Sequence, residues 1–225
     1  MQSCFQMELT KLRKRIIKMF GLVHIQLDKS SQSLLNQEFE VLDLAMQNEN
    51  RIDKLDIKID KLCQKIFALA QPVATDLRFI MSSLRIANEI ERIGDITLDI
   101  ISRSEAVKSY PEILEQYRVH ELIEQVMEIN RRAEESYSNN NSDLAKENIT
   151  SCKQSEEVCK TVFNEIIAQM TEKSEVITIA TDLILIIRDL ERISNHMENI
   201  AESVVFIVEG KRLRHAGTNS DTSLP

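Results

Sequence analysis

The feature that most constrains this fold is a helical stretch that occurs twice, one hundred residues apart. The segment LRIANEIERIGDITLDIISRS begins at Leu84, and the segment ILIIRDLERISNHMENIAES begins at Ile184. The triplet Glu-Arg-Ile at 91–93 matches the same triplet at 191–193. A repeat of this length is too long for a solenoid unit, so it indicates two similar helical halves, each with one such helix at its centre.

A helical wheel at about 100° per residue gives the first copy two apolar arcs. The first arc consists of Phe79, Ile86, Ile90, Ile93 and Ile100. The second arc, marked by Leu84 and Leu98, is interrupted by three carboxylates at i, i+4 and i+8, those of Glu91, Asp95 and Asp99. A helix that is apolar on two sides packs between neighbours, so we expect this one to be central.

The composition favours long helices over sheets, because 225 residues include only 4 Gly and 3 Pro, with 4% aromatic residues. We expect an all-α fold of two tandem three-helix bundles related by the internal repeat. The six predicted helices cover approximately residues 5–36, 38–71, 72–108, 110–138, 142–170 and 175–210, with Ser142 as the N-cap of the fifth. The predicted domains are residues 1–108 and 109–215, followed by a flexible tail at 216–225.

Charge and cysteine content narrow the functional class. A net charge of −8 argues against nucleic-acid binding, which needs a concentrated basic surface. The first ten residues contain no apolar run of signal length, and no apolar window is long enough to span a bilayer. The 4 cysteines form no CxxC pair, which favours reduced thiols. We therefore expect a cytoplasmic protein.

The second predicted helix sorts its charges by sign. Its acids lie within an arc of about 60° on the wheel, whereas its bases occupy the other side. The acids of this ladder are Glu49, Asp53, Asp56 and Asp60, and the bases are Arg51, Lys54, Lys58, Lys61 and Lys65. Carboxylates next to a core are costly when unpaired, so protons, arginines of a neighbouring helix or metal ions must compensate them.

If the second and third helices pack antiparallel, this ladder faces Glu91 and Asp95. Oxygen ligands without histidine suit hard cations such as iron, manganese or magnesium, so we predict a metal site made of Glu49, Asp53, Asp56, Asp60, Glu91 and Asp95. The alternative is a solvated acidic stripe. A ferritin-like di-iron oxidase would need Glu-x-x-His pairs, and no histidine of this chain has Glu three residues before it. Motifs of nucleophilic catalysis are absent as well, which favours a binding protein over an enzyme.

The second half keeps fewer of these acids. Asn195 stands where the first half has Asp95, so any second site should be weaker. Its candidate ligands are Glu156, Glu191 and Asn195. A separate hypothesis concerns Arg78, Arg85 and Arg92, which are spaced by seven and form a basic stripe. The stripe is either an ordinary solvated face or a surface that engages acidic or phosphorylated partners.

The motifs QPVATDLR at 71–78 and ERIGD at 91–95 resemble the signature of the PhoU family of phosphate transport accessory proteins. The residues from 191–193 through 199–202 to Gly210 and Arg214-His215 resemble the end of the same family, so the resemblance covers nearly the whole chain. It implies an acid-x-x-x-Asp pattern that is associated with bound iron or other metal clusters. That pattern holds at Glu49-Asp53, Asp56-Asp60 and Glu91-Asp95, and it fails at Glu191-Asn195.

The resemblance implies a non-enzymatic regulator that restrains phosphate uptake and the phosphate-starvation response. Its implied partners are the ATPase of a phosphate ABC transporter and a membrane sensor histidine kinase, and membrane contact would come only through them. We also expect a homodimer. The competing hypothesis is a helical metal-binding or metal-storage protein that has no transporter partner.

Overall fold

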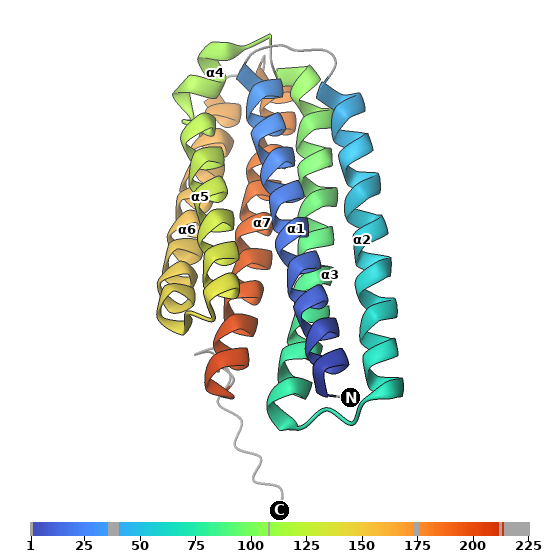
Figure 1. The fold of residues 1–225 in the computed structure, drawn as a ribbon. Helices are drawn as coiled ribbons and strands as arrows, with labels where there is room; N and C mark the ends of the chain where they lie inside the picture. Colours follow the sequence, from blue (N-terminus) through green and yellow to red (C-terminus); the bar gives the residue numbers. More distant parts are fainter. Residues whose placement is uncertain (1, 36–40, 108, 173–175, 212, 214–225) are drawn as a thin grey trace, which may run out of the picture.

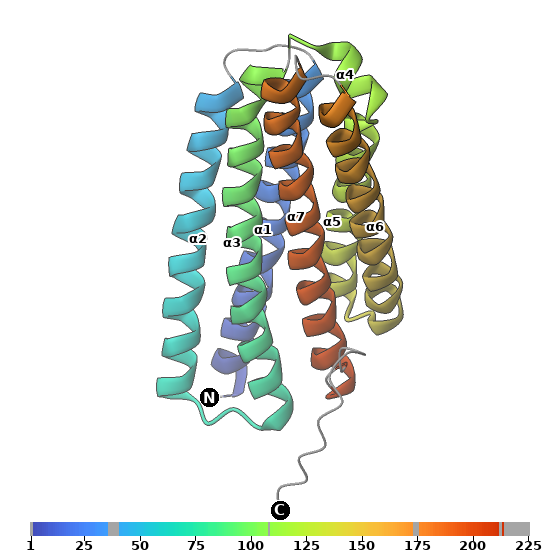
Figure 2. The same ribbon diagram turned by 180° about the vertical axis from the view of Figure 1, so that it is seen from behind.

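The two copies of the repeated stretch lie side by side at the centre of the molecule (Figure 1). A computed structural model describes residues 2–35, 41–107, 109–172, 176–211 and 213. The first copy lies on α3 (Ala74–Val107) and the second on α7 (Ile177–Glu209). α2 (Val41–Leu69) flanks α3 and α6 (Ser142–Glu172) flanks α7, so that four helices form one layer, seen from behind in Figure 2.

The other layer consists of α1 (Gln2–Leu35) and α5 (Val119–Asn139), with the short α4 (Pro111–Gln116) at one end (Figure 1). The first bundle is therefore α1, α2 and α3, and the second is α5, α6 and α7. The prediction of an all-α fold with two tandem three-helix bundles is confirmed. The boundary predicted between residues 108 and 109 stays a prediction, and the predicted tail at 216–225 lies outside the described residues.

One large hydrophobic core extends through both bundles. On α3 the isoleucines at 86, 90, 93 and 100 are fully buried, and on α7 the matching positions 186, 190, 193 and 200 are fully buried too. These residues belong to one continuous cluster with the buried faces of the other helices. The two-sided apolar pattern therefore predicted the central position of this helix correctly, because its first arc is buried in the core and Leu84 and Leu98 of its second arc are half-buried against neighbouring helices.

The prediction of six helices is wrong at one place, since the described part of the chain contains seven. The helix predicted over 110–138 is broken between Tyr117 and Val119, where Arg118 adopts a left-handed conformation with φ of 50°. Tyr117 is buried, and its hydroxyl donates a hydrogen bond to Gln169 of α6. The break lets α4 fold across the end of the bundle and bury Leu114.

The helix ends follow simple capping rules. Pro111 occupies the first turn of α4, where its missing N–H costs nothing. The predicted N-cap at Ser142 is wrong by one residue, because the side chain of Asn141 accepts the hydrogen bond from the backbone N–H of Leu144 at 3.0 Å. Gly210 ends α7 with φ of 70°, as expected for a glycine C-cap. None of the helices in the described part of the chain contains an apolar stretch of the length that a bilayer requires.

Candidate functional site

The acids of α2 face α3 at different depths. Glu49 is buried, with 7% of its surface exposed, whereas Asp53, Asp56 and Asp60 are half-buried. The five basic residues at 51, 54, 58, 61 and 65 are all exposed. The predicted sorting of charges by sign is therefore confirmed, and the half-buried carboxylates line the seam between α2 and α3.

Glu49 is held by α1 as well as by α3. Its Oε2 accepts a hydrogen bond of 2.6 Å from Nε2 of Gln26, and the same amide nitrogen donates to the carbonyl oxygen of Gly94 at 2.9 Å. Asn48 donates in turn to Oε1 of Gln26 at 2.7 Å and to the carbonyl of Leu22 at 2.8 Å. Three helices thus meet in one buried polar cluster, with Glu49 as its acid.

Gly94 is the reason that Glu49 can lie against α3. A Cβ at this position would lie 2.8 Å from Oε2 and 3.0 Å from Oε1 of Glu49, and 3.1 Å from Cδ1 of Ile52. Only glycine leaves this space free. Burial raises the pKa of Glu49 to about 7, against the effect of the Gln26 hydrogen bond, and the negative charges of Asp95, Asp53 and Glu91 add to the rise.

Three other acids of this seam also have raised pKa values. Burial, and then the neighbouring acids, raise the pKa of Asp56, of Glu91 and of Asp95 above the usual values. One oxygen of Glu49 and one of Asp56 are buried without a hydrogen-bond partner. Asp60 is different, because its Oδ2 accepts a hydrogen bond of 2.7 Å from Gln64. The seam is a place where negative charge is poorly compensated.

The donor set of this seam fits a hard cation in chemistry, since Glu49 and Asp56 of α2 each have a buried oxygen without a partner, and the carboxylates of Glu91 and Asp95 on α3 face these acids. In the positions that the structure gives them, no three acidic, histidine or cysteine side chains of the described residues gather closely enough to hold a metal ion. The oxygen atoms that would bind the metal therefore require side-chain rearrangement, and the metal site at 49, 53, 56, 60, 91 and 95 stays a prediction.

The matching seam of the second half is compensated by cations. Oε1 of Glu156 lies 2.7 Å from Nζ of Lys160, one turn away on α6. Glu191 is buried on α7, and its Oε2 accepts a hydrogen bond of 2.9 Å from Arg188. Asn195 is exposed. The second predicted site therefore contains two carboxylates that each have a basic partner.

The two central helices are also linked by polar side chains. Oε2 of Glu89 on α3 lies 2.6 Å from Nδ1 of His196 and accepts a hydrogen bond of 3.3 Å from Asn199, both on α7. In the opposite direction Asp189 of α7 lies 3.9 Å from Arg103 of α3. These contacts fix the two halves relative to each other at the middle of the layer.

The predicted arginine stripe does not have one environment. Arg85 and Arg92 are exposed, whereas Arg78 is half-buried and lies against Gly210 at the end of α7. Arg78 and Arg85 line a hollow of about 460 Å³ together with Leu77, Met81 and Phe206, among others. The stripe therefore joins an apolar hollow at the α3–α7 seam, and its role in partner binding stays a prediction.

Comparison with known proteins gives the family. The model of the PhoU domain matches residues 16–104 and again residues 119–204. The chain belongs to the PhoU family. The two matches coincide with the two bundles, so each half of the fold corresponds to one PhoU domain.

Relatives match over nearly the full length. A phosphate-specific transport system accessory protein PhoU homolog of Pseudomonas aeruginosa is 29% identical over 214 residues, which cover 95% of this chain and 88% of the relative. A homolog of the same description from Pseudomonas putida is 30% identical and covers 97% of this chain and 86% of the relative. The resemblance to the PhoU family expected from the sequence motifs is confirmed.

Solved structures agree. The crystal structure of PhoU from Pseudomonas aeruginosa has a TM-score of 0.85 and 28% identity, and the match covers 92% of this chain and 100% of that one. A PhoU structure from Streptococcus pneumoniae, a phosphate transport system regulatory protein, has a TM-score of 0.83 at 23% identity, covering 94% and 100% of the two chains. The second match shows the PhoU fold alone.

Sequence reasoning missed the buried partners of Glu49 in this PhoU chain. Gln26, Asn48 and Gly94 hold the carboxylate, yet none was expected to belong to the site. The signal was present for Gln26, because it continues the stripe of buried residues at 12, 16, 19 and 23 of α1. A polar residue in an apolar stripe requires a partner.

Proposed function

We propose that this chain is an accessory protein of a phosphate transport system that restrains phosphate uptake and the phosphate-starvation response. The observation that carries the proposal is the match of both bundles to the PhoU domain. Relatives named as phosphate-specific transport system accessory proteins, at 29% and 30% identity over nearly the whole chain, support it. In this proposal the protein acts by binding, without catalysis, as a homodimer in the cytoplasm.

The proposed partners are the ATPase of a phosphate ABC transporter and a membrane sensor histidine kinase. The hollow beside Arg78 and Arg85 supports a contact surface for them, because it combines apolar side chains with guanidinium groups that can bind carboxylates or phosphates. A partner with an acidic side chain next to an apolar one fits this surface.

The experiment is a pull-down of the tagged protein from phosphate-replete cells. We expect to recover the transporter ATPase, the sensor kinase or both, and we expect R85E to reduce their recovery. The matched control is R131E on α5, which reverses a charge on an exposed residue of the other layer. A protein that only stores metal would recover neither partner, which would overturn the proposal. Equal recovery with R85E and the unsubstituted protein would remove Arg85 from the contact surface.

We further propose that the α2–α3 seam binds a hard metal ion such as iron, manganese or magnesium. The support is a set of acids that share raised pKa values and include two buried oxygen atoms without partners. Asp53, Asp56, Glu91 and Asp95 would supply ligands from the half-buried or exposed part of the seam. A bound cation would neutralise charge that Arg92 compensates only in part.

A further inference from the structure

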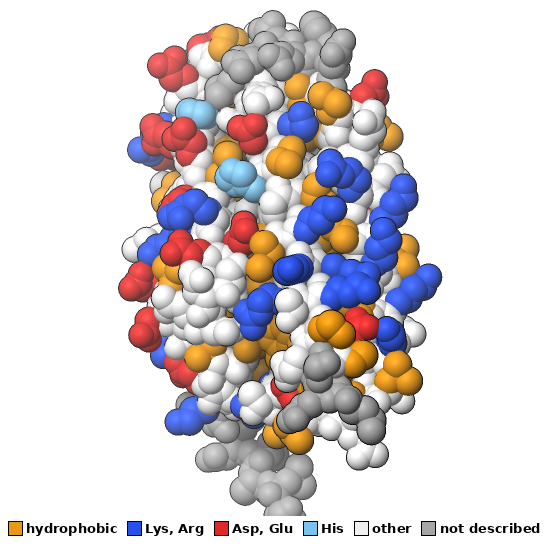
Figure 3. All heavy atoms as spheres, in the orientation of Figure 1, with side chains coloured by type: hydrophobic (Ala, Val, Ile, Leu, Met, Phe, Trp, Pro, Cys, Tyr) orange, Lys and Arg blue, Asp and Glu red, His pale blue; other side chains and the backbone are white. Residues whose placement is uncertain are grey.

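Lysine and arginine side chains gather over the outer face of α1 and α2, on the right in Figure 3. We call this surface the basic face. Its exposed members are Lys11, Lys14 and Lys18 of α1, and Arg51, Lys54, Lys58, Lys61 and Lys65 of α2. Three or four residues separate neighbours along each helix, so each set forms a stripe on one side of its helix.

The two stripes lie next to each other because α1 and α2 pack side by side. Arg15 of α1 donates a hydrogen bond to the backbone carbonyl of Lys58, and Glu8 of α1 pairs with Lys65 at 2.5 Å. The antiparallel register therefore brings Lys14 and Lys18 of α1 opposite the middle of the α2 stripe. The result is a two-helix-wide array of positive charge.

Most of this charge has no partner. Glu8 pairs with Lys65 and lies 3.9 Å from Lys11. Lys14, Lys18, Lys54, Lys58 and Lys61 form no ion pair with any residue that the structure describes. The acids of α2 cannot compensate them, because these acids line the seam with α3 on the other side of the helix. A chain with a net charge of −8 thus concentrates unpaired cations on one face.

Exposed aliphatic side chains stand at both ends of the basic face. Met7 precedes Lys11 by one turn and is 62% exposed, and Leu69 follows Lys65 by one turn and is 76% exposed. At the opposite end Ile25 follows Lys18 by seven residues and Leu44 precedes Arg51 by seven, so both continue the stripes, and both are exposed. A face of cations flanked by exposed apolar groups is typical of surfaces that lie on a membrane.

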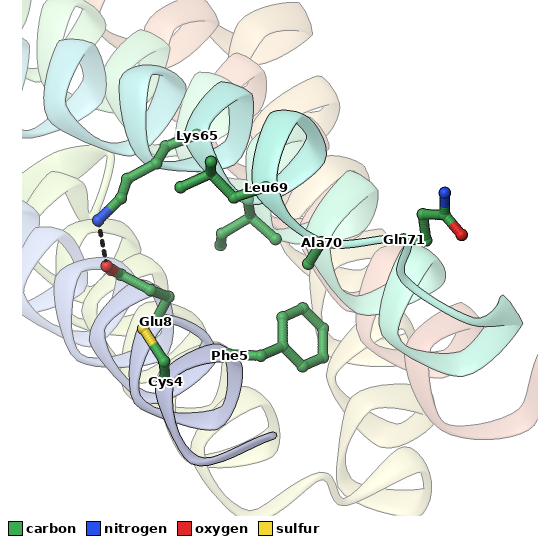
Figure 4. Close-up of a pocket in the computed structure, with 8 residues that line it drawn as sticks. Cys4, Phe5, Glu8, Lys65, Leu69, Ala70 and Gln71 are labelled. Atoms are coloured by element: carbon green, nitrogen blue, oxygen red, sulfur yellow. Dashed lines mark hydrogen bonds and ion pairs between the residues drawn. The ribbon is translucent and has the colours of Figure 1, made fainter. Parts of the chain in front are cut away.

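A hollow of about 590 Å³ opens at the Met7 end of the basic face (Figure 4). Phe5 of α1, Ile66 and Leu69 of α2, and Ala70 just after α2 give it apolar walls, and the ion pair between Glu8 and Lys65 crosses beside it. The hollow therefore places apolar surface directly next to two charges of the face.

We propose that the basic face docks on a bilayer surface that contains anionic phospholipids. The charges are complementary, and lysine dominates, which favours a diffuse array of headgroup phosphates over a single carboxylate that a guanidinium fork would bind. The exposed aliphatic residues and the apolar walls of the hollow contact the boundary between headgroups and acyl chains. This contact goes beyond the proposed function, in which the protein reaches the membrane only through its partners.

The experiment is co-sedimentation of the purified full chain with protein-free vesicles. Binding is measured on vesicles of phosphatidylcholine mixed with phosphatidylglycerol and on vesicles of phosphatidylcholine alone. We expect binding to the anionic vesicles only, and we expect it to fall as the salt concentration rises from about 0.05 M to about 0.5 M, because salt screens exposed charges.

The triple variant K14Q/K18Q/K58Q should weaken binding roughly 100-fold, since each cation near an anionic membrane strengthens binding about five-fold. The matched control is K146Q/K153Q/K160Q, which removes the same charge from α6 and should bind like the unsubstituted chain. Leu69→Asn should weaken binding by a smaller factor, as expected for lost apolar contact beside the charges.

Several outcomes would overturn this proposal: equal binding to neutral vesicles, no dependence on salt, or equal losses in the two triple variants. If K14Q/K18Q/K58Q bound vesicles normally but lost the transporter ATPase or sensor kinase in pull-downs, the basic face would belong to an acidic protein partner instead. The vesicles contain no protein, so a lack of vesicle binding would overturn the membrane contact without overturning the accessory function. Recovery of the partners in the pull-down likewise does not decide whether the basic face binds lipid.

Discussion

The two acid seams of the molecule are built on matching helix pairs but compensate their carboxylates differently. In the second half Lys160 pairs with Glu156 at 2.7 Å and Arg188 with Glu191 at 2.9 Å. In the first half Asp56, Glu91 and Asp95 form no ion pair with a described residue, and their pKa values are raised. In the second seam, lysine and arginine side chains compensate the carboxylates. In the first seam, protons or cations from solution must do so.

Both added cations and lost acids in the second half account for this difference. Counted along the repeat, Ile57 stands where α6 has Lys160, and Asn88 stands where α7 has Arg188. Phe163 replaces Asp60, and the guanidinium of Arg188 lies 5.8 Å from the centre of its ring, which adds a cation–π contact to the ion pair. Duplication has thus preserved the helix pair while the charges on it diverged.

The largest expected effect is a difference between the two seams in the stabilisation that metal binding gives. At a free metal concentration about 1,000 times the Kd, binding to the folded state should raise its stability by about 4 kcal/mol. D56N/D95N should lose most of this stabilisation, because it keeps the shapes and removes two charges. E156Q/E191Q should keep it. Thermal melts with and without Mn²⁺, Fe³⁺ or Mg²⁺ measure both, and melts that ignore all three metals would contradict the metal site.

The next effect concerns Glu49 and pH. Its pKa is about 7 in the folded chain and near 4.5 when unfolded, so the folded state binds the proton more tightly. The stabilisation is complete below about pH 4.5 and is lost as pH rises to about 7, a change of about 3 kcal/mol. Urea unfolding in the presence of a chelator should show this slope, and E49Q should remove the part of it that comes from Glu49. E156Q is the control and should leave the slope in place.

Gly94→Ala should destabilise the fold by roughly 1–3 kcal/mol, because the added Cβ overlaps the buried carboxylate of Glu49. The matching variant S194A in the second half removes the hydrogen bonds that the Ser194 hydroxyl donates to Ser155 at 3.0 Å and to the Leu190 carbonyl at 3.2 Å, which costs about 1 kcal/mol. Denaturant unfolding measures both. If the contact with Glu49 is the cause, E49A/G94A should cost less than the sum of its single variants. An additive result would assign the effect to the backbone.

The smallest effect comes from exchanging the cations between the seams. I57K/N88R places lysine and arginine on exposed positions of the first seam, and K160I/R188N removes them from the second. Each double variant should change the free energy of unfolding by about 1 kcal/mol or less, because the lysine and arginine side chains of these ion pairs are exposed to solvent. The stabilisation by metal should decrease in I57K/N88R and increase in K160I/R188N. Unchanged responses would show that ligand geometry, rather than local cations, distinguishes the seams.

The sequence predicted most of the fold because helix periodicity reports burial directly. The apolar arcs of α3 predicted that Ile86 and Ile100 lie in the core, and the charge pattern of α2 predicted that its lysines lie on the surface. The break at Arg118 could not be predicted, because neither Tyr117 nor Arg118 is a residue that favours a turn. That left-handed conformation is imposed by tertiary packing, in which Tyr117 is buried against α6.

The candidate site was predicted only in part. A helical wheel shows which acids share a face, but not their depth, and it treats Glu49 and Asp60 alike although one is buried and the other half-exposed. The partners of Glu49 come from α1 and α3, so only the packed structure identifies them. The ion pair of Glu156 with Lys160, four residues apart on one helix, could have been predicted from spacing alone.

The continuous core has a consequence for how this molecule can be divided. Its two halves resemble independent modules in sequence, yet α3 and α7 bury their apolar faces against each other, and Glu89 and Asp189 each reach across to the opposite helix. Cutting the chain near residue 109 would expose that central wall to water. The two halves should therefore unfold together on heating, in one cooperative transition. Either half expressed alone should aggregate, or bind a second copy through the exposed apolar face.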